Sequence, residues 1–147
     1  MAPPTSAAGE SGNALASASM RGVDVRLLLP AKCDVPLVGP AARSYYPKLV
    51  AAGVRAFEYL PSMLHAKTLV VDGRWGIVGS ANVDVRSFRL NFELGALVID
   101  DEFAARLEER FMSDVSQSRE VTEGELDQRG FMARLGYGAA RLLSPLL

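Results

Sequence analysis

The sequence predicts an α/β domain with a mixed β-sheet flanked by helices. The first observation is a strand–helix–strand succession, in which apolar runs at 23–29 and 54–59 enclose an amphipathic segment at 41–52. Strands joined through a helix pair in parallel. The second observation is an Asp-Gly pair between apolar runs at 67–71 and 75–78, which is typical of an antiparallel hairpin. Both kinds of pairing in one chain predict a mixed sheet.

The segments that follow the hairpin continue the alternation of strand and helix. A further strand is predicted over 92–99. An amphipathic helix is predicted over 101–112, because phenylalanine and leucine side chains repeat there at four-residue spacing. Two acidic residues stand at its start, where the helix dipole stabilises negative charge. A last helix is predicted over 131–143.

The length of 147 residues fits a single domain. We expect residues 1–20 to form a flexible N-terminal segment, because their first part is rich in Pro, Ala, Ser and Thr. Within it, residues 11–20 have the composition of a helix closed by Gly22. Residues 21–147 are then expected to form the folded domain.

Composition excludes several classes of protein. The net charge is −1, so nothing in it demands a nucleic-acid partner. The single cysteine, Cys33, excludes a disulfide framework and argues against a structural zinc site. No apolar run reaches the roughly 18 residues of a membrane span, and the first residues lack the pattern of a secretory signal. If the protein works at a membrane, we therefore expect it to lie on the surface or to be held there by something outside this chain.

The polar residues around the predicted hairpin include the only histidine of the chain, His65. Lys67 follows two positions later, so on a strand both side chains point to the same face. A loop at 72–73 places Ser80 opposite His65, and a loop at 73–74 places it opposite Lys67. Either loop brings four polar side chains to one face of the hairpin, namely those of His65, Lys67, Ser80 and Asn82.

This set of side chains suits a phosphodiester. Lys67 supplies a cation for the non-bridging oxygens, and Ser80 and Asn82 supply neutral donors for the charge that grows in the transition state. A neutral imidazole attacks phosphorus, and an imidazolium protonates a leaving alkoxide. No carboxylate cluster with metal-ligand spacing accompanies them, so we expect chemistry without a metal or other cofactor.

The motifs that these residues form resemble those of the phospholipase D superfamily. His65-Ala-Lys67-Thr-Leu-Val-Val-Asp72 matches its HxKxxxxD signature, and Gly79-Ser80-Ala81-Asn82 matches the GSxN segment that follows. Glu93 stands where that family places a carboxylate that hydrogen-bonds the nucleophilic histidine. The stretch 78–93 is similar, more narrowly, to the C-terminal catalytic half of bacterial cardiolipin synthases, and the resemblance extends from about residue 21 to the C-terminus.

The resemblance implies one phospholipase D-like half with a single HKD motif. It implies a phosphatidyltransferase that forms a phosphohistidine and passes the phosphatidyl group to an alcohol, such as a hydroxyl of phosphatidylglycerol. It also implies peripheral binding to the cytoplasmic side of a membrane. The implied catalytic residues are His65, Lys67, Asp72 and Glu93, and the implied phosphate-binding residues are Lys67, Ser80 and Asn82. The Asp-Gly turn explains Asp72 by itself, so a structural role is the simpler interpretation of that residue.

The chain departs from the family because it contains one motif where family enzymes combine two. The partner half is expected from a second copy of the chain or from a module that precedes this one. The aromatic-proline strand that opens this half in the family is missing, and residues 3–10 stand in its place. Two alternatives therefore stay open: a phosphodiesterase or nuclease that uses water, and a catalytically silent fragment. The sequence leaves open whether His65 is the nucleophile or the general acid.

Overall fold

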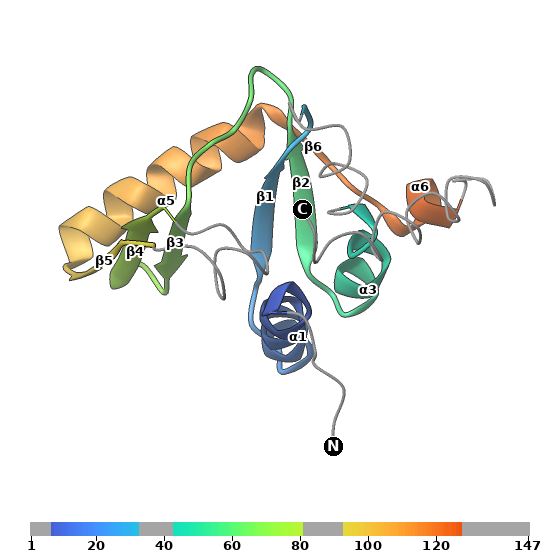
Figure 1. Cartoon of the computed structure of the whole chain (residues 1–147), viewed down its shortest axis with the longest axis horizontal. Coiled ribbons are helices and arrows are strands. Elements are labelled where there is room, and N and C mark those ends of the chain that lie inside the picture. Colours follow the sequence, from blue (N-terminus) through green and yellow to red (C-terminus); the bar gives the residue numbers. More distant parts are fainter. Residues whose placement is uncertain (1–6, 33–42, 81–92, 128–147) are drawn as a thin grey trace.

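The computed structural model describes residues 7–32, 43–80 and 93–127 (Figure 1). Helices and strands alternate through these residues, as the α/β class requires. In chain order the elements are α1 (Ala7–Met20), β1 (Arg26–Pro30), α3 (Tyr46–Ala51), β2 (Arg55–Tyr59), β3 (Thr68–Val71), β4 (Trp75–Gly79), β5 (Gly95–Ile99), α5 (Asp101–Ser116), β6 (Ser118–Glu120) and α6 (Glu123–Asp127).

The predicted strand–helix–strand unit forms a mixed sheet. β1 and β2 are parallel, with Arg26 opposite Arg55 and Pro30 opposite Tyr59. β6, which the sequence did not predict, joins the other edge of β2 in antiparallel orientation. α3 lies within the helix predicted over 41–52, of which residues 41–42 are outside the described residues. It has Pro47 in its first turn, where a missing backbone N–H costs no hydrogen bond.

The predicted hairpin belongs to a second sheet, in which β3, β4 and β5 pair in antiparallel order. The predicted α/β class with mixed pairing is thus confirmed, while the strands divide between two three-stranded sheets. α5 packs on one face of the second sheet, where a Cβ added to Gly76 would lie 2.8 Å from Leu107 Cδ2. Figure 1 shows α5 running along this sheet toward β6, so the helix connects the two sheets.

The turn of the hairpin differs from both predicted loops. Asp72 and Gly73 both have positive φ, at 55° and 61°, and Arg74 N donates to Val71 O at 3.1 Å. Val71 pairs with Trp75, so the loop contains three residues instead of two. The predicted registers were therefore wrong by one residue, because Arg74 stays outside the ladder, as the third residue does in three-residue hairpin loops.

The N-terminal segment contains the helix that the sequence predicts there. α1 begins at Ala7, and its Ala16 is buried in a cluster with Leu49 and Val54. The helix predicted over 11–20 is therefore present and begins at Ala7, while the boundary between a flexible segment and the domain stays a prediction. The last predicted helix, over 131–143, and Cys33 lie outside the described residues.

A buried carboxylate joins three parts of the first sheet. Glu58, on β2, accepts from Arg43 Nε at 3.0 Å and from Arg119 Nη2 at 2.6 Å. Arg43 also donates to the backbone oxygen of Ala31 at 2.8 Å. Burial raises the pKa of Glu58, but the hydrogen bonds from the two guanidinium groups outweigh it and hold this pKa below its usual range. The carboxylate thereby ties β2 to β6 and to the chain before α3.

Candidate functional site

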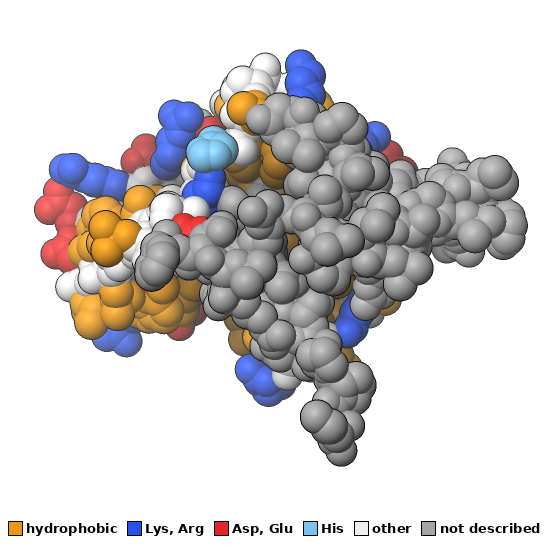
Figure 2. All heavy atoms as spheres, in the orientation of Figure 1, with side chains coloured by type: hydrophobic (Ala, Val, Ile, Leu, Met, Phe, Trp, Pro, Cys, Tyr) orange, Lys and Arg blue, Asp and Glu red, His pale blue; other side chains and the backbone are white. Residues whose placement is uncertain are grey.

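Three of the predicted polar residues, His65, Lys67 and Ser80, lie at one end of the second sheet. β3 begins there, β4 ends there and β5 begins there, because antiparallel neighbours run in opposite directions. His65 lies in the segment between β2 and β3 and is exposed, and Lys67 directly precedes β3. Figure 2 shows the histidine, in pale blue, at the surface of the molecule beside a lysine or arginine side chain.

Lys67 folds back onto His65. Its Nζ lies 3.0 Å from Nδ1 and 3.1 Å from Nε2 of the imidazole, and it donates to the backbone oxygen of His65 at 2.9 Å. An ammonium group donates to a ring nitrogen only where that nitrogen carries a lone pair. A neutral imidazole has only one such nitrogen, so the ammonium group donates to at most one of the two.

Ser80 and Glu93 form a second polar pair at the same end of the sheet. Ser80 Oγ donates to Glu93 Oε2, and the backbone N–H of Leu94 donates to Ser80 Oγ at 3.1 Å. The hydroxyl is thus held between a carboxylate that accepts its proton and an amide that donates to its oxygen. The hydrogen bond from His65 to Glu93 that the resemblance implies stays a prediction.

Backbone hydrogen bonds connect the two pairs across the strands. Gly79 N donates to Lys67 O at 3.0 Å, and Ser80 N donates to Leu94 O at 2.9 Å. The register therefore continues to a pairing of Lys67 with Gly79, and Ser80 is opposite neither His65 nor Lys67, as the three-residue loop requires. The shared end of three strands brings the motifs together instead of the predicted face-to-face pairing.

Gly79, the first residue of the GSxN segment, is needed for the close approach of β4 and β5. Gly79 pairs with Gly95, and a Cβ added to Gly79 would lie 2.7 Å from Leu94 O, a distance that excludes any side chain. Glycine inside a strand pattern marks such close approach of backbones, so the signal was present in the sequence. Without this approach Ser80 would not reach Glu93 and Leu94.

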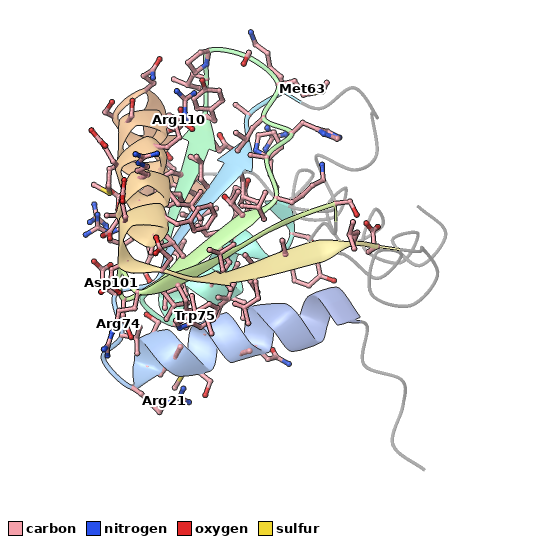
Figure 3. All side chains as sticks on the ribbon, turned by 90° about the vertical axis from the view of Figure 1, so that its left-hand side faces the viewer. Arg21, Met63, Arg74, Trp75, Asp101 and Arg110 are labelled. Carbon is pink, nitrogen blue, oxygen red and sulfur yellow. The ribbon has the colours of Figure 1, made fainter. Side chains whose placement is uncertain are left out.

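The structure does not bring every predicted site residue together. Asp72 lies in the turn at the opposite end of β3 from Lys67, about 16 Å away along an extended strand. Figure 3 shows the adjacent Arg74 and Trp75 at this turn end of the hairpin, near Asp101 at the start of α5. Asn82 lies outside the described residues.

The arrangement offers a cation, an imidazole, a hydroxyl group and a carboxylate on a solvent-accessible strand end. In the part of the chain that the structure describes, no three histidine, cysteine or acidic side chains are placed to hold a metal ion. The same residues contain no helix that is long and apolar enough to cross a bilayer.

Comparisons with known proteins point to the family that the motifs resemble. Residues 4–115 match the family model described as "Cardiolipin synthase, PLD-like domain". The chain is 45% identical over 134 residues to cardiolipin synthase A of Pseudomonas fluorescens Pf-5, and the match covers 91% of this chain. It is 42% identical over 134 residues, again 91% of this chain, to cardiolipin synthase of Geobacillus kaustophilus. The matched region spans 28% and 27% of the length of these two relatives.

A solved structure supports the same fold. The phospholipase D family member Nuc from Salmonella typhimurium superposes with a TM-score of 0.66 and 24% sequence identity. The match covers 76% of this chain and 73% of that one.

Proposed function

Because the chain belongs to the cardiolipin synthase family of PLD-like domains, we propose that it provides one half of a phosphatidyltransferase site. The observation that carries this proposal is the convergence of the His65–Lys67 contact and the Ser80–Glu93 hydrogen bond at one end of the second sheet. A phosphodiester needs a nucleophile, a cation and hydrogen-bond donors close together, and this strand end supplies all three.

In the proposed reaction His65 attacks the phosphorus of a phospholipid. A bond forms between phosphorus and a ring nitrogen, and the bond between phosphorus and the leaving glycerol oxygen breaks. A second acid protonates that oxygen. An alcohol, such as a hydroxyl of phosphatidylglycerol, then attacks phosphorus, gives its proton to the conjugate base of the second acid and releases the imidazole. The products are a new phosphodiester and the free enzyme, so the phosphatidyl group is conserved.

The other residues have supporting roles in this proposal. Lys67 neutralises the non-bridging oxygens, and Asn82 donates to them as charge develops. Ser80 donates to them as well, by exchanging its hydrogen bond to Glu93 for one to the phosphate. Glu93 orients the imidazole by accepting a hydrogen bond from its N–H, which raises the basicity of the opposite nitrogen. Asp72 shapes the turn of the hairpin and takes no direct part in the reaction.

The second acid is supplied by a partner half in this proposal. One motif provides one imidazole, whereas the reaction uses one group to attack and another to protonate. The partner half comes from a second copy of the chain or from a module joined to it in a longer protein. If His65 serves as the proton donor, the partner provides the nucleophile. The substrate lies in a membrane, so the domain is expected to work at a membrane surface.

The proposal is tested by trapping the intermediate. Phosphatidylglycerol with a labelled phosphate is mixed with the chain, and the protein is examined for a label that acid removes and base does not. The label should map to His65 and disappear in His65→Ala. Arg74→Ala is the control, because Arg74 is exposed at the other end of the hairpin. Transferase activity that survives in His65→Ala at more than a trace would contradict the assignment.

A further inference from the structure

The face of the second sheet that carries Lys67 has an ordered arrangement of side chains. Because side chains alternate along a strand, residues at every second position share this face. In the first row, Lys67 is followed across the strands by the paired glycines, Gly79 and Gly95. The next two rows are entirely apolar, and we call their six residues the apolar tract: Leu69, Ile77 and Leu97, then Val71, Trp75 and Ile99.

The apolar tract lies on the face that α5 does not cover. α5 packs against the opposite face, at Gly76. Leu69, Leu97 and Ile99 are 45%, 59% and 80% exposed, which is unusual for three neighbouring aliphatic side chains. Figure 2 shows hydrophobic side chains gathered over β4 and β5, on the side of the molecule where the histidine also lies. Exposed apolar surfaces of this kind are found where proteins bind other proteins, membranes or ligands.

Resting on the proposed function, we propose that the apolar tract binds the acyl chains of the phospholipid whose phosphate lies at His65 and Lys67. The polarity of the face matches that of such a lipid. A cation lies at one end, and hydrocarbon side chains begin one two-residue step, about 7 Å, further along the strands. A phosphodiester at Lys67 therefore has apolar surface at the distance where its acyl chains begin.

The glycine pair leaves the space that the lipid backbone needs between phosphate and acyl chains. A Cβ added to Gly95 would lie 3.7 Å from Ile77 Cγ2, an ordinary contact distance, and Gly95 does not have positive φ. The packing of the described residues therefore does not require glycine at this position. Gly95 thus leaves an open position in the row of Lys67, on the far side of Gly79, and glycine within a strand is found where a ligand approaches closely.

Trp75 gives a direct test, because it is the only tryptophan of the chain and lies in the tract. The whole chain is mixed with vesicles of phosphatidylcholine and phosphatidylglycerol, in which the phosphatidylglycerol carries bromine on its acyl chains. Bromine quenches indole fluorescence at short range. We expect strong quenching with these vesicles, and none when the same vesicles lack bromine.

Variants assign the quenching to the tract. Replacing Leu97 and Ile99 together by serine should weaken binding roughly tenfold or more, because two exposed side chains lose their burial in hydrocarbon. Met20→Ser is the matched control, since Met20 is an exposed apolar residue on α1, outside the tract. Circular dichroism verifies that each variant is folded.

Three results would overturn the inference. The first is unchanged Trp75 fluorescence when brominated vesicles are added. The second is quenching in the double variant that is as strong as in the parent. The third result combines two measurements: the parent is a dimer in ultracentrifugation and shows no quenching, and the double variant is a monomer. This result would assign the tract to the binding of a second copy. Quenching without a histidine adduct would contradict only the proposed function, and an adduct without quenching would contradict only the present inference.

Discussion

Replacing Glu58 by glutamine should destabilise the fold, because it removes the charge that two guanidinium groups share. Its side chain is 3% exposed and accepts from both Arg43 and Arg119. A glutamine amide has only one acceptor oxygen, so one of the two hydrogen bonds is lost and the other no longer has a charged acceptor, each at a cost of about 1 kcal/mol or more. Because Arg43 and Arg119 are 27% and 49% exposed, water compensates part of this loss. We therefore expect about 2–3 kcal/mol, below the 3–5 kcal/mol typical of a fully buried pair.

The measurement is urea unfolding at pH 7, followed by circular dichroism. The loss corresponds to a decrease of about 10 °C in Tm for a domain of this size. Glu120→Gln is the matched control, because Glu120 lies next to Arg119 on β6. Glu120 accepts from Arg55 at 2.9 and 3.0 Å, but the side chains of this pair are 47% and 41% exposed. An exposed pair contributes at most about 1 kcal/mol. Equal effects of the two variants would refute the argument from burial.

The contribution of Glu58 should depend on pH in one direction. Its pKa in the folded state is lowered from the ordinary value of 4.5, so the folded state binds its proton less readily than the unfolded state. The stabilisation is therefore fully present above pH 4.5 and is lost as the pH falls through the lowered pKa. The difference in unfolding free energy between the parent and Glu58→Gln should be constant from pH 7 to about 5.5 and shrink below 4.5. A difference that grew toward acid would contradict this sign.

Three further predictions concern packing, catalysis and assembly. Gly76→Ala should lower the unfolding free energy, measured by urea unfolding, by about 1–3 kcal/mol, because its Cβ would lie 2.8 Å from Leu107. Gly124→Ala is the control and should not destabilise the fold, because a Cβ at that position has nothing within 4 Å. Glu93→Gln should keep the circular dichroism spectrum and lower the transferase rate roughly tenfold or more, and full activity would show that the charge of Glu93 has no role. If two copies complete the site, specific activity should rise with chain concentration below the dimer dissociation constant. A fully active species that light scattering shows to be monomeric would exclude the paired site.

The sequence by itself determined the class of the fold and the segments that carry the chemistry. The alternation of apolar runs with an amphipathic segment predicted the parallel pair β1–β2, and the Asp-Gly pair predicted the hairpin. The HxKxxxxD signature together with Ser80, Asn82 and Glu93 predicted the superfamily, and the family model confirms it. These features are local, so a pattern of a few residues contains the whole signal.

The tertiary structure alone decided how these segments meet. The length of the Asp-Gly loop was three residues instead of two, and this difference moved Ser80 away from its predicted position opposite His65 or Lys67. The contact of Ser80 with Glu93 and the separation of Asp72 from Lys67 likewise depend on which strand ends lie side by side. Side chains alternate with a period of two, so a single extra loop residue changes every cross-strand pairing without changing the apolar pattern of either strand.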